Sequence, residues 1–285
     1  MLKNSFLHIP GIGAAFERKL WDLGILDWDC IVCGRQFKSS PQKKEAITRY
    51  AQESIEQLFC NNPKYFADHL PANQQWRIFP EFRNSTAYID IETTGLDMWD
   101  FEITTIALYD GKSIRHYVQR DNLENFIHDI QQYNVIVTYN GKSFDVPFIE
   151  NHFGTKLNHA HIDLRYVLKS LGYSGGLKSC EKALGIDRGD LDGVDGYFAV
   201  LLWLDYQQNN NKKALETLLA YNIEDVVNLE TLMLMAYNMK IKDTPFCNTH
   251  ELPLPQVPEI PFKADHETIE RIKGKIFASS SPYQY

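Results

Sequence analysis

The chain has 285 residues, a formal net charge of −8 at pH 7, 44% hydrophobic residues and 13% aromatic residues. This length predicts roughly two domains on a prior of about 150 residues each, and the composition excludes a disordered chain. No apolar run approaches the roughly 20 residues that span a bilayer, and the N-terminus lacks a signal-peptide core. We therefore expect a cytoplasmic protein without a membrane partner. The acidic balance also argues against broad electrostatic affinity for nucleic acid.

The five cysteines are an odd number and form no disulfide framework, which agrees with a reducing compartment. Cys30 and Cys33 have the spacing of metal ligands, but no second close pair follows them in the sequence. We expect both to be structural thiols, and a zinc or iron–sulfur site is the alternative.

Composition shifts and Pro/Gly punctuation divide the chain into four expected segments. These are a small helical N-terminal region (1–38), a helical connector (39–82), a large α/β domain (83–239) and a proline-rich tail (240–285). The tail holds six of the twelve prolines and is expected to be extended.

The N-terminal region contains an Ile-Pro-Gly-Ile-Gly sequence before a helical pattern that Gly24 ends. This sequence resembles half of a helix-hairpin-helix element, in which backbone N–H groups of a glycine hairpin contact phosphate. A structural turn between two helices is the alternative. The resemblance implies nucleic-acid binding by Gly11, Gly13, Arg18 and Lys19.

In the connector, one helix is predicted from Pro41 to about Phe66. In the large domain, an antiparallel meander followed by an α/β crossover predicts a mixed sheet flanked by helices. A long helix over about 214–238 closes this domain. The strands are predicted at residues 85–92, 102–109, 113–119, 135–139 and 160–164.

The most informative stretch is the first of these strands, which carries Asp90 and Glu92. Residues two apart in a strand share a face, so the two carboxylates lie side by side while Ile89 and Ile91 enter the core. Like charges at this spacing repel each other unless a cation lies between them. Oxygen ligands favour Mg²⁺ or Mn²⁺, because no His or Cys adjoins the pair. An exposed edge strand whose acids face water is the alternative.

Asp145 follows the predicted strand at 135–139, after a turn that begins at Asn140. Ligands of α/β sheets bind at the carboxyl ends of the strands, which makes Asp145 a candidate ligand near the start of the next helix. For this residue taken alone, a helix N-cap is the better interpretation.

Tyr221 and Asp225 lie in the long final helix. Their spacing of four places the hydroxyl and the carboxylate on one face, a turn apart. A surface salt bridge of Asp225 is the alternative for this pair alone. The occurrence of all three motifs in one chain favours a shared metal site.

Taken together, Asp90 with Glu92, Asn140 with Phe144-Asp145, and Tyr221 with Asp225 resemble, in order and type, the three motifs of the DEDD exonuclease superfamily. The tyrosine spacing is similar to that of the DEDDy branch, to which polymerase proofreading domains belong. Residues 161–165 and 176–186 are similar to the bacterial YprB-like ribonuclease-H-like exonuclease domains. The resemblance covers a little over half of the chain.

The resemblance implies a ribonuclease-H-like fold and removal of nucleotides from a 3′ end with two divalent ions, Mg²⁺ or Mn²⁺. Asp90 would bridge the ions, Glu92 and Asp225 would hold the ion beside the attacking water, and Asp145 would hold the other. Tyr221 would orient the water. The expected partner is a single-stranded 3′ end, of DNA in preference to RNA, although no residue identifies a reader of the 2′-hydroxyl.

Substrate contacts are expected around the same motifs. Phe144 would stack on a terminal base or belong to the core. Lys178 is favoured for phosphate, because the preceding glycines would let a helix N-terminus approach it. Ordinary solvated surface is the alternative for each cation. The candidate substrate-binding residues are Asn140, Phe144, Lys142, Lys178 and Lys182, with Arg165 and Arg188 as further cations that would follow the phosphate backbone.

The leading hypothesis is thus a 3′–5′ exonuclease. One alternative is a catalytically quiet ribonuclease-H-like module that binds nucleic acid or a protein partner, against which the presence of all four acids argues. The second alternative is a structure-specific endonuclease that uses the same two metal ions.

Overall fold

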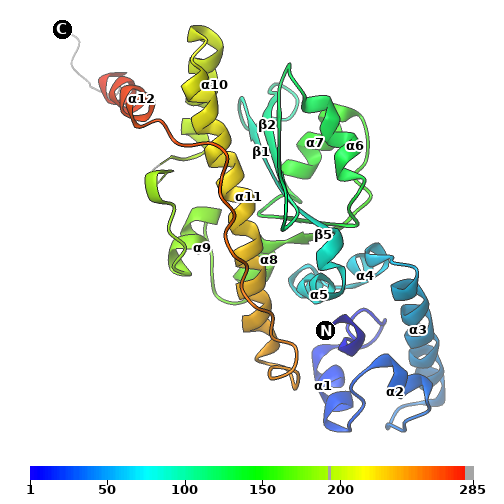
Figure 1. Ribbon diagram of the computed structural model, residues 1–285. Coiled ribbons are helices and arrows are strands. Elements are labelled where there is room, and N and C mark those ends of the chain that lie inside the picture. The colour runs from blue at the N-terminus through cyan, green and yellow to red at the C-terminus, as the bar shows by residue number, and fades with distance from the viewer. Residues whose placement is uncertain (192–193, 280–285) are drawn as a thin grey trace.

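The computed structural model describes residues 1–191 and 194–279 and is centred on a five-stranded sheet with the order β3-β2-β1-β4-β5 (Figure 1). The antiparallel meander consists of β1 (Thr86–Thr93), β2 (Ile103–Tyr109) and β3 (Ile114–Val118). The strands β4 (Val135–Thr138) and β5 (Ala160–Asp163) extend the sheet from β1 in parallel. The predicted mixed sheet is confirmed, with every strand within one residue of its predicted bounds.

Helices cover both faces of this sheet (Figure 1). On one face, Ile89 and Ile91 of β1 pack in a core with α6 (Phe126–Ile130) and α7 (Asp145–Phe153). The other face is covered by α11 (Lys212–Ile241), the long helix predicted over 214–238. This helix is buried over much of its circumference, so its apolar residues occur on several sides rather than along a single stripe.

The remaining helices surround this centre. None of the helices described in residues 1–191 and 194–279 combines the length and apolar character of a membrane span. The α-helices are α1 (Ala14–Asp22), α2 (Trp28–Val32), α3 (Pro41–Phe59), α4 (Pro63–His69), α5 (Phe79–Phe82), α8 (Leu164–Lys169), α9 (Leu177–Ala183), α10 (Gly196–Asn209) and α12 (His266–Ser279). Short 3₁₀ turns are η1 (Leu2–Asn4), η2 (Ala72–Ile78), η3 (Arg83–Ser85), η4 (Leu123–Asn125) and η5 (Gly189–Leu191).

The single helix predicted from Pro41 to about Phe66 is wrong, because the chain forms two helices there. Asn61 adopts a left-handed conformation with φ of 55°, and Asn62 caps α4 through its side chain. Pro63 then occupies the first turn of α4. A proline cannot donate the backbone hydrogen bond that a continuous helix would need at this position.

The predicted extended tail is only partly correct. Residues 251–260 have no regular secondary structure and follow α11 back along its length (Figure 1). The Asp265 N–H then donates to the Thr217 hydroxyl at 3.0 Å, and α12 packs its buried Ile269 and Ile272 inward. Arg271 of α12 pairs with Asp205 of α10 at 2.8 Å. The last six residues of the predicted segment, 280–285, lie outside the described part of the chain.

The N-terminal region is joined to η2 by a buried ion pair. The Arg77 guanidinium donates to both carboxylate oxygens of Glu17, at 3.1 and 3.0 Å. Glu17 also accepts the Phe6 N–H at 2.7 Å, and both charged side chains are at least 94% buried. Both Glu17 oxygens therefore accept hydrogen bonds. Burial lowers the pKa of Arg77, and the Glu17 carboxylate opposes this effect. The predicted segment boundaries at 38, 82 and 239 stay predictions.

Glu17→Ala should lower the free energy of unfolding by about 3–5 kcal/mol, because it leaves the Arg77 charge buried without a partner. Denaturant unfolding followed by circular dichroism measures this change. Glu45→Ala, on the exposed side of α3, is the matched control and should change stability by less than about 0.5 kcal/mol. Equal effects of the two substitutions would contradict a stabilising ion pair.

Candidate active site

The central strand β1 presents Asp90 and Glu92 toward α11, on the face opposite Ile89 and Ile91. The predicted side-by-side arrangement of the two acids is confirmed. Glu92 lies at the end of the regular β1–β2 pairing, where the register shifts before Thr93. The acids therefore lie at the carboxyl end of β1, where the sheet opens.

The helix α11 brings Asp225 to this pair. One carboxylate oxygen from each of Asp90, Glu92 and Asp225 lies within 4.8 Å of the others. Asn222, one turn before Asp225, donates to Asp90 Oδ2 at 2.7 Å and accepts from the Thr105 hydroxyl at 3.0 Å. The acid of β1 is thus fixed by hydrogen bonds from α11, and Asn222 was not among the predicted site residues.

Asp145 is the first residue of α7, directly after the turn that follows β4. Its Oδ1 accepts the Ile91 N–H at 3.2 Å, and the side chain is buried. The helix N-cap interpretation is wrong, because Phe144 occupies the cap position and makes no side-chain cap bond. Asp145 lines the same cavity as the other three acids but is not part of the 4.8 Å group.

The carboxylates of Asp90, Glu92 and Asp145 have too little positive charge beside them to compensate for their burial. Burial raises the pKa of Asp90 and of Glu92 well above the ordinary value, and the Asp225 carboxylate raises both further. Burial also raises the pKa of Asp145 to about 7, against the hydrogen bonds it accepts from backbone N–H groups. Each shift means that a negative charge is unfavourable at this position unless a cation accompanies it.

The donor set fits a divalent cation. Carboxylate oxygens are the preferred ligands of Mg²⁺, and two oxygens on opposite sides of such an ion lie about 4 Å apart. The 4.8 Å group is only slightly wider, so small rotations of its carboxylates would complete a site. No other three His, Cys, Asp or Glu side chains bring ligand atoms within 4.8 Å of one another in residues 1–191 and 194–279. Cys30 and Cys33 accordingly gather no further ligand there.

The cavity that contains the acids has a volume of about 540 Å³. Two of its lining residues, Leu96 and Tyr197, are 85% and 65% exposed at its mouth. Tyr221 is buried in the cavity wall. Burial is the main cause that raises the pKa of this tyrosine, and the negative charges of Asp225, Glu92 and Asp90 raise it further. Phe144 also lines the cavity and packs on Phe148, with ring centroids 4.9 Å apart. Phe144 thus packs against the core and also faces the cavity, and its contact with a base stays a prediction.

The predicted lysines differ in their surroundings. Lys178 lies 4.3 Å from the centre of the Tyr221 ring and donates to the Val194 carbonyl. Burial lowers the pKa of Lys178, and Asp225 opposes this effect. Lys142 is half-buried and donates to Gln75 at 2.7 Å, whereas Lys182 is exposed. Of these three, Lys178 is the one that reaches the acid cluster.

Asn140 lies two residues after the end of β4, in a left-handed conformation with φ of 66°. Its N–H donates to Asp163 at 2.8 Å, and its side-chain oxygen accepts from Arg165. The next residue must be a glycine, because a Cβ atom at Gly141 would lie 2.3 Å from the Thr138 hydroxyl oxygen. The turn is therefore held rigidly and directs the chain into α7.

Arg188 is not the surface cation that the sequence suggested. Its side chain is buried and donates to Glu181 at 2.7 Å and to Asp225. Asn228 donates to the other oxygen of Glu181 at 2.9 Å. No periodic pattern in the sequence indicated this network, because it joins α11 to residues 37 or more positions away.

The glycine hairpin at the N-terminus lies outside this cavity. Gly11, Gly13, Arg18 and Lys19 are all exposed, and Gly13 caps α1. The element before the hairpin is the three-residue turn η1 rather than a helix. A complete helix-hairpin-helix element is therefore not formed. Nucleic-acid binding by these residues stays a prediction.

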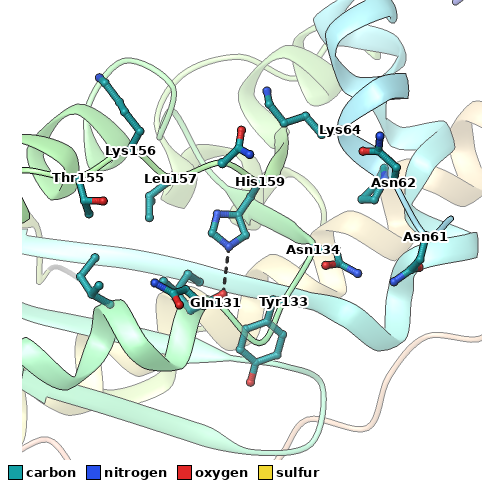
Figure 2. Close-up of a pocket in the computed structure, with 14 residues that line it drawn as sticks. Asn61, Asn62, Lys64, Gln131, Tyr133, Asn134, Thr155, Lys156, Leu157 and His159 are labelled. Atoms are coloured by element: carbon teal, nitrogen blue, oxygen red, sulfur yellow. Dashed lines mark hydrogen bonds between the residues drawn. The ribbon is translucent and has the colours of Figure 1, made fainter. Parts of the chain in front are cut away.

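Figure 2 shows a second hollow, of about 390 Å³, around His159, which pairs with the Ile130 carbonyl at 3.0 Å. Asn134 and His159 directly precede β4 and β5, so this hollow lies at the amino ends of the strands. None of the described residues that line it is an acid. The acid-lined cavity at the opposite end is therefore the candidate active site.

Comparisons with solved structures give distant likenesses. A family B DNA polymerase from Pyrobaculum calidifontis is 16% identical over 55% of this chain and 24% of its own, with a TM-score of 0.41. Brucella melitensis NrnC bound to pGG is 15% identical over 73% of this chain and 93% of its own, with a TM-score of 0.40. Brucella melitensis NrnC with bound Mg²⁺ gives the same identity and TM-score over 73% of this chain and 94% of its own. No curated protein shows a significant match.

At these identities and TM-scores, assignment of the chain rests on its match to a family model. The model of the ribonuclease H superfamily matches residues 87–237, which begin in β1 and end in α11. The matched span is more than half of the 285 residues and contains every acid of the cavity. The DEDDy branch and the YprB-like family stay predictions. The chain belongs to the ribonuclease H superfamily, as its motifs predicted.

Proposed function

We propose that this protein is a metal-dependent 3′–5′ exonuclease that acts on single-stranded ends. The observation that carries the proposal is the convergence of Asp90, Glu92 and Asp225 within 4.8 Å in a cavity open to solvent. A nuclease needs such a cluster to collect positive charge beside a phosphodiester, whereas a purely structural site would avoid burying uncompensated acids. The superfamily match supports the same chemistry.

Asp90, Glu92 and Asp225 would hold one divalent ion, and Asp145, on the same cavity wall, would take part in holding a second. When bound, such ions lower the pKa of an attacking water and neutralise the charge on the leaving oxygen. The chain itself contributes the orientation of the groups. Asn222 fixes Asp90, and the Ile91 N–H fixes Asp145, before any ion is present.

Tyr221 would orient the attacking water through its hydroxyl. An ordinary tyrosine pKa near 10 already leaves this hydroxyl protonated at neutral pH, and burial raises the pKa of Tyr221 further, so the hydroxyl donates a hydrogen bond. Lys178, 4.3 Å from the Tyr221 ring, lies close enough to the site to attract a phosphate group. The two residues therefore divide the tasks of orienting water and holding the substrate.

The terminal nucleotide would enter between Leu96 and Tyr197, which line the mouth of the cavity from the β1–β2 loop and from α10. Exposed apolar and aromatic side chains can stack on the bases of a single strand without regard to sequence. Phe144 would contact the base deeper in the cavity. A duplex has no free base face at its interior positions, which favours a single-stranded end as the substrate.

The test is digestion of single-stranded oligonucleotides with Mn²⁺ or Mg²⁺, with the label at either the 5′ or the 3′ end. A 5′ label should yield a ladder that shortens from the 3′ end, and a 3′ label should yield mononucleotides at once. Internal products would favour the endonuclease alternative. Metal-free binding of the oligonucleotide with no digestion at any metal concentration would favour the quiet module. Matched DNA and RNA strands test the expected preference for DNA.

Asp90→Asn should lower the rate of digestion by more than about 100-fold, because partners of metal ligands are themselves worth about 10–100-fold. The same substitution should raise the melting temperature in metal-free buffer, since it removes one of the repelling charges. Activity assays and thermal melts check the two effects. Asp121→Asn, at an exposed position, is the control and should alter neither. A lower melting temperature of Asp90→Asn would contradict the repulsion argument.

Asp145→Asn should stabilise the metal-free protein more as the pH rises. Between the ordinary pKa of 3.8 and about 7, folded Asp145 binds a proton that the unfolded chain releases, so wild-type stability falls across this window. The variant lacks this loss, which should reach up to about 4 kcal/mol above pH 7. Buried His8 and His161, with pKa values lowered to about 3, act in the opposite direction but equally in both proteins. Denaturant unfolding at pH 4 to 8 measures the difference, and a constant difference would contradict the prediction.

Tyr221→Phe should lower the rate by about 10-fold, because it removes the one hydrogen bond that orients the attacking water, worth about 1.4 kcal/mol. It should leave the affinity for Mn²⁺ unchanged, because the phenol is not needed to hold the ion. Activity assays and isothermal titration with Mn²⁺ separate the two effects. If rate and affinity fall together, Tyr221 has a structural role instead.

A further inference from the structure

Among the described residues, Arg188 is the one arginine that forms an ion pair with a member of the 4.8 Å group of Asp90, Glu92 and Asp225. It lies between α9 and η5, and its side chain is 6% exposed. Each of its three nitrogens faces a carboxylate. Nη1 donates to Glu181 at 2.7 Å, Nη2 donates to Asp225, and Nε lies 3.5 Å from Glu224. A guanidinium that is buried among three acids is an element of the site and not a solvated surface group.

These contacts form a closed circuit that begins and ends on α11. Asp225 binds Arg188, Arg188 binds Glu181, and the other Glu181 oxygen accepts from Asn228 at 2.9 Å. Asn228 lies three residues after Asp225, so the two share a face of the helix. The circuit therefore limits the rotation of the Asp225 carboxylate relative to the helix that carries it.

The circuit leaves Asp225 able to bind a cation. Arg188 Nη2 donates to Oδ1 alone, so Oδ2 of Asp225 has no partner in the circuit. Arg188 is also the partner of Glu181, which is itself fully buried. If Arg188 moved aside when an ion bound, Glu181 would keep a buried charge without compensation. The arrangement favours an arginine that stays in place while the ion binds.

We propose that Arg188 is a positioning residue of the metal site, which orients Asp225 for a divalent ion through the circuit with Glu181 and Asn228. The inference rests on the proposed metal-dependent function of the same cavity. A lysine cannot replace Arg188, because a single ammonium group does not present two parallel donors to Glu181 and Asp225 at fixed spacing. Partners that orient metal ligands in this way are typically worth about 10–100-fold in metal affinity.

The experiment is titration of the metal-free protein with Mn²⁺, followed by electron paramagnetic resonance or calorimetry. Arg188→Lys keeps the positive charge and loses the planar fork, so it isolates geometry from charge. Its dissociation constant for Mn²⁺ should rise about 10–100-fold. In digestion assays, kcat should fall while KM for the oligonucleotide stays unchanged.

Arg83→Lys is the matched control. Arg83 pairs at 2.9 Å with Glu230, a buried acid of the same helix α11, and touches none of the cavity acids. This substitution also exchanges an arginine for a lysine in an ion pair to α11. It should lower the melting temperature slightly and leave Mn²⁺ affinity and digestion unchanged.

Glu181→Gln opens the circuit one step away from Asp225 and provides a milder variant if Arg188→Lys does not fold. It should weaken Mn²⁺ binding less than Arg188→Lys does. The double variant should bind Mn²⁺ as weakly as Arg188→Lys alone, because both substitutions act through the same circuit. Additive losses in this double-mutant cycle would show that Glu181 acts independently of Arg188 and would overturn the proposal.

Other outcomes are equally decisive. Tighter Mn²⁺ binding in the folded variants would make Arg188 a cation that competes with the metal, and unchanged binding would make it purely structural. Either result overturns the positioning role while the nuclease proposal stands. If the wild-type protein binds no Mn²⁺ at all, both the proposed function and this inference fail.

Discussion

The constraint on which the structure depends is the burial of several carboxylates with too little positive charge beside them. Asp90, Glu92, Asp145 and Asp225 line one cavity, and burial raises the pKa of the first three. Among the residues that the structure describes, Lys178 and Arg188 act on the Glu92 carboxylate as cations. Repulsion of this kind opposes folding, so the surrounding structure must supply the stability that holds the acids together.

Much of that stability comes from α11. The helix lies across β1 and β2, while η2, α10 and the returning tail pack against it (Figure 1). Because α11 is enclosed by apolar contacts, Tyr221 and Asp225 are held at fixed positions in spite of their unfavourable surroundings. Asn222 and Arg188 then connect these positions to β1 and α9. The same helix thus supplies both much of the core and the acid that joins Asp90 and Glu92 in the 4.8 Å group.

The sequence predicts those parts of this arrangement that depend on local periodicity. Alternation in β1 predicts that Asp90 and Glu92 share a face, and a spacing of four predicts the same of Tyr221 and Asp225. The role of Arg188 could not be predicted in this way, because Asp225, its partner on α11, lies far away in the sequence. The local sequence around a buried arginine of this kind does not differ from that around an exposed one. Two features that were predicted wrongly did carry local signals. Pro63 indicates a break in the helix predicted from Pro41 to about Phe66. Ile269 and Ile272, three residues apart, indicate a helix with a buried face inside the segment that its proline content predicted to be extended.

The acidic character of the chain has a different meaning once the site is considered. A net charge of −8 disfavours non-specific binding to a polyanion, and the acid cluster would repel a phosphate most strongly at the very place where a nuclease must bind it. Under the proposed function, the ion must therefore bind before the substrate, because only then does the cavity attract a phosphodiester. Contacts of Leu96, Phe144 and Tyr197 with bases would meanwhile depend little on charge. Such an enzyme would hold a few nucleotides at a strand end and release long duplexes, which agrees with its overall charge.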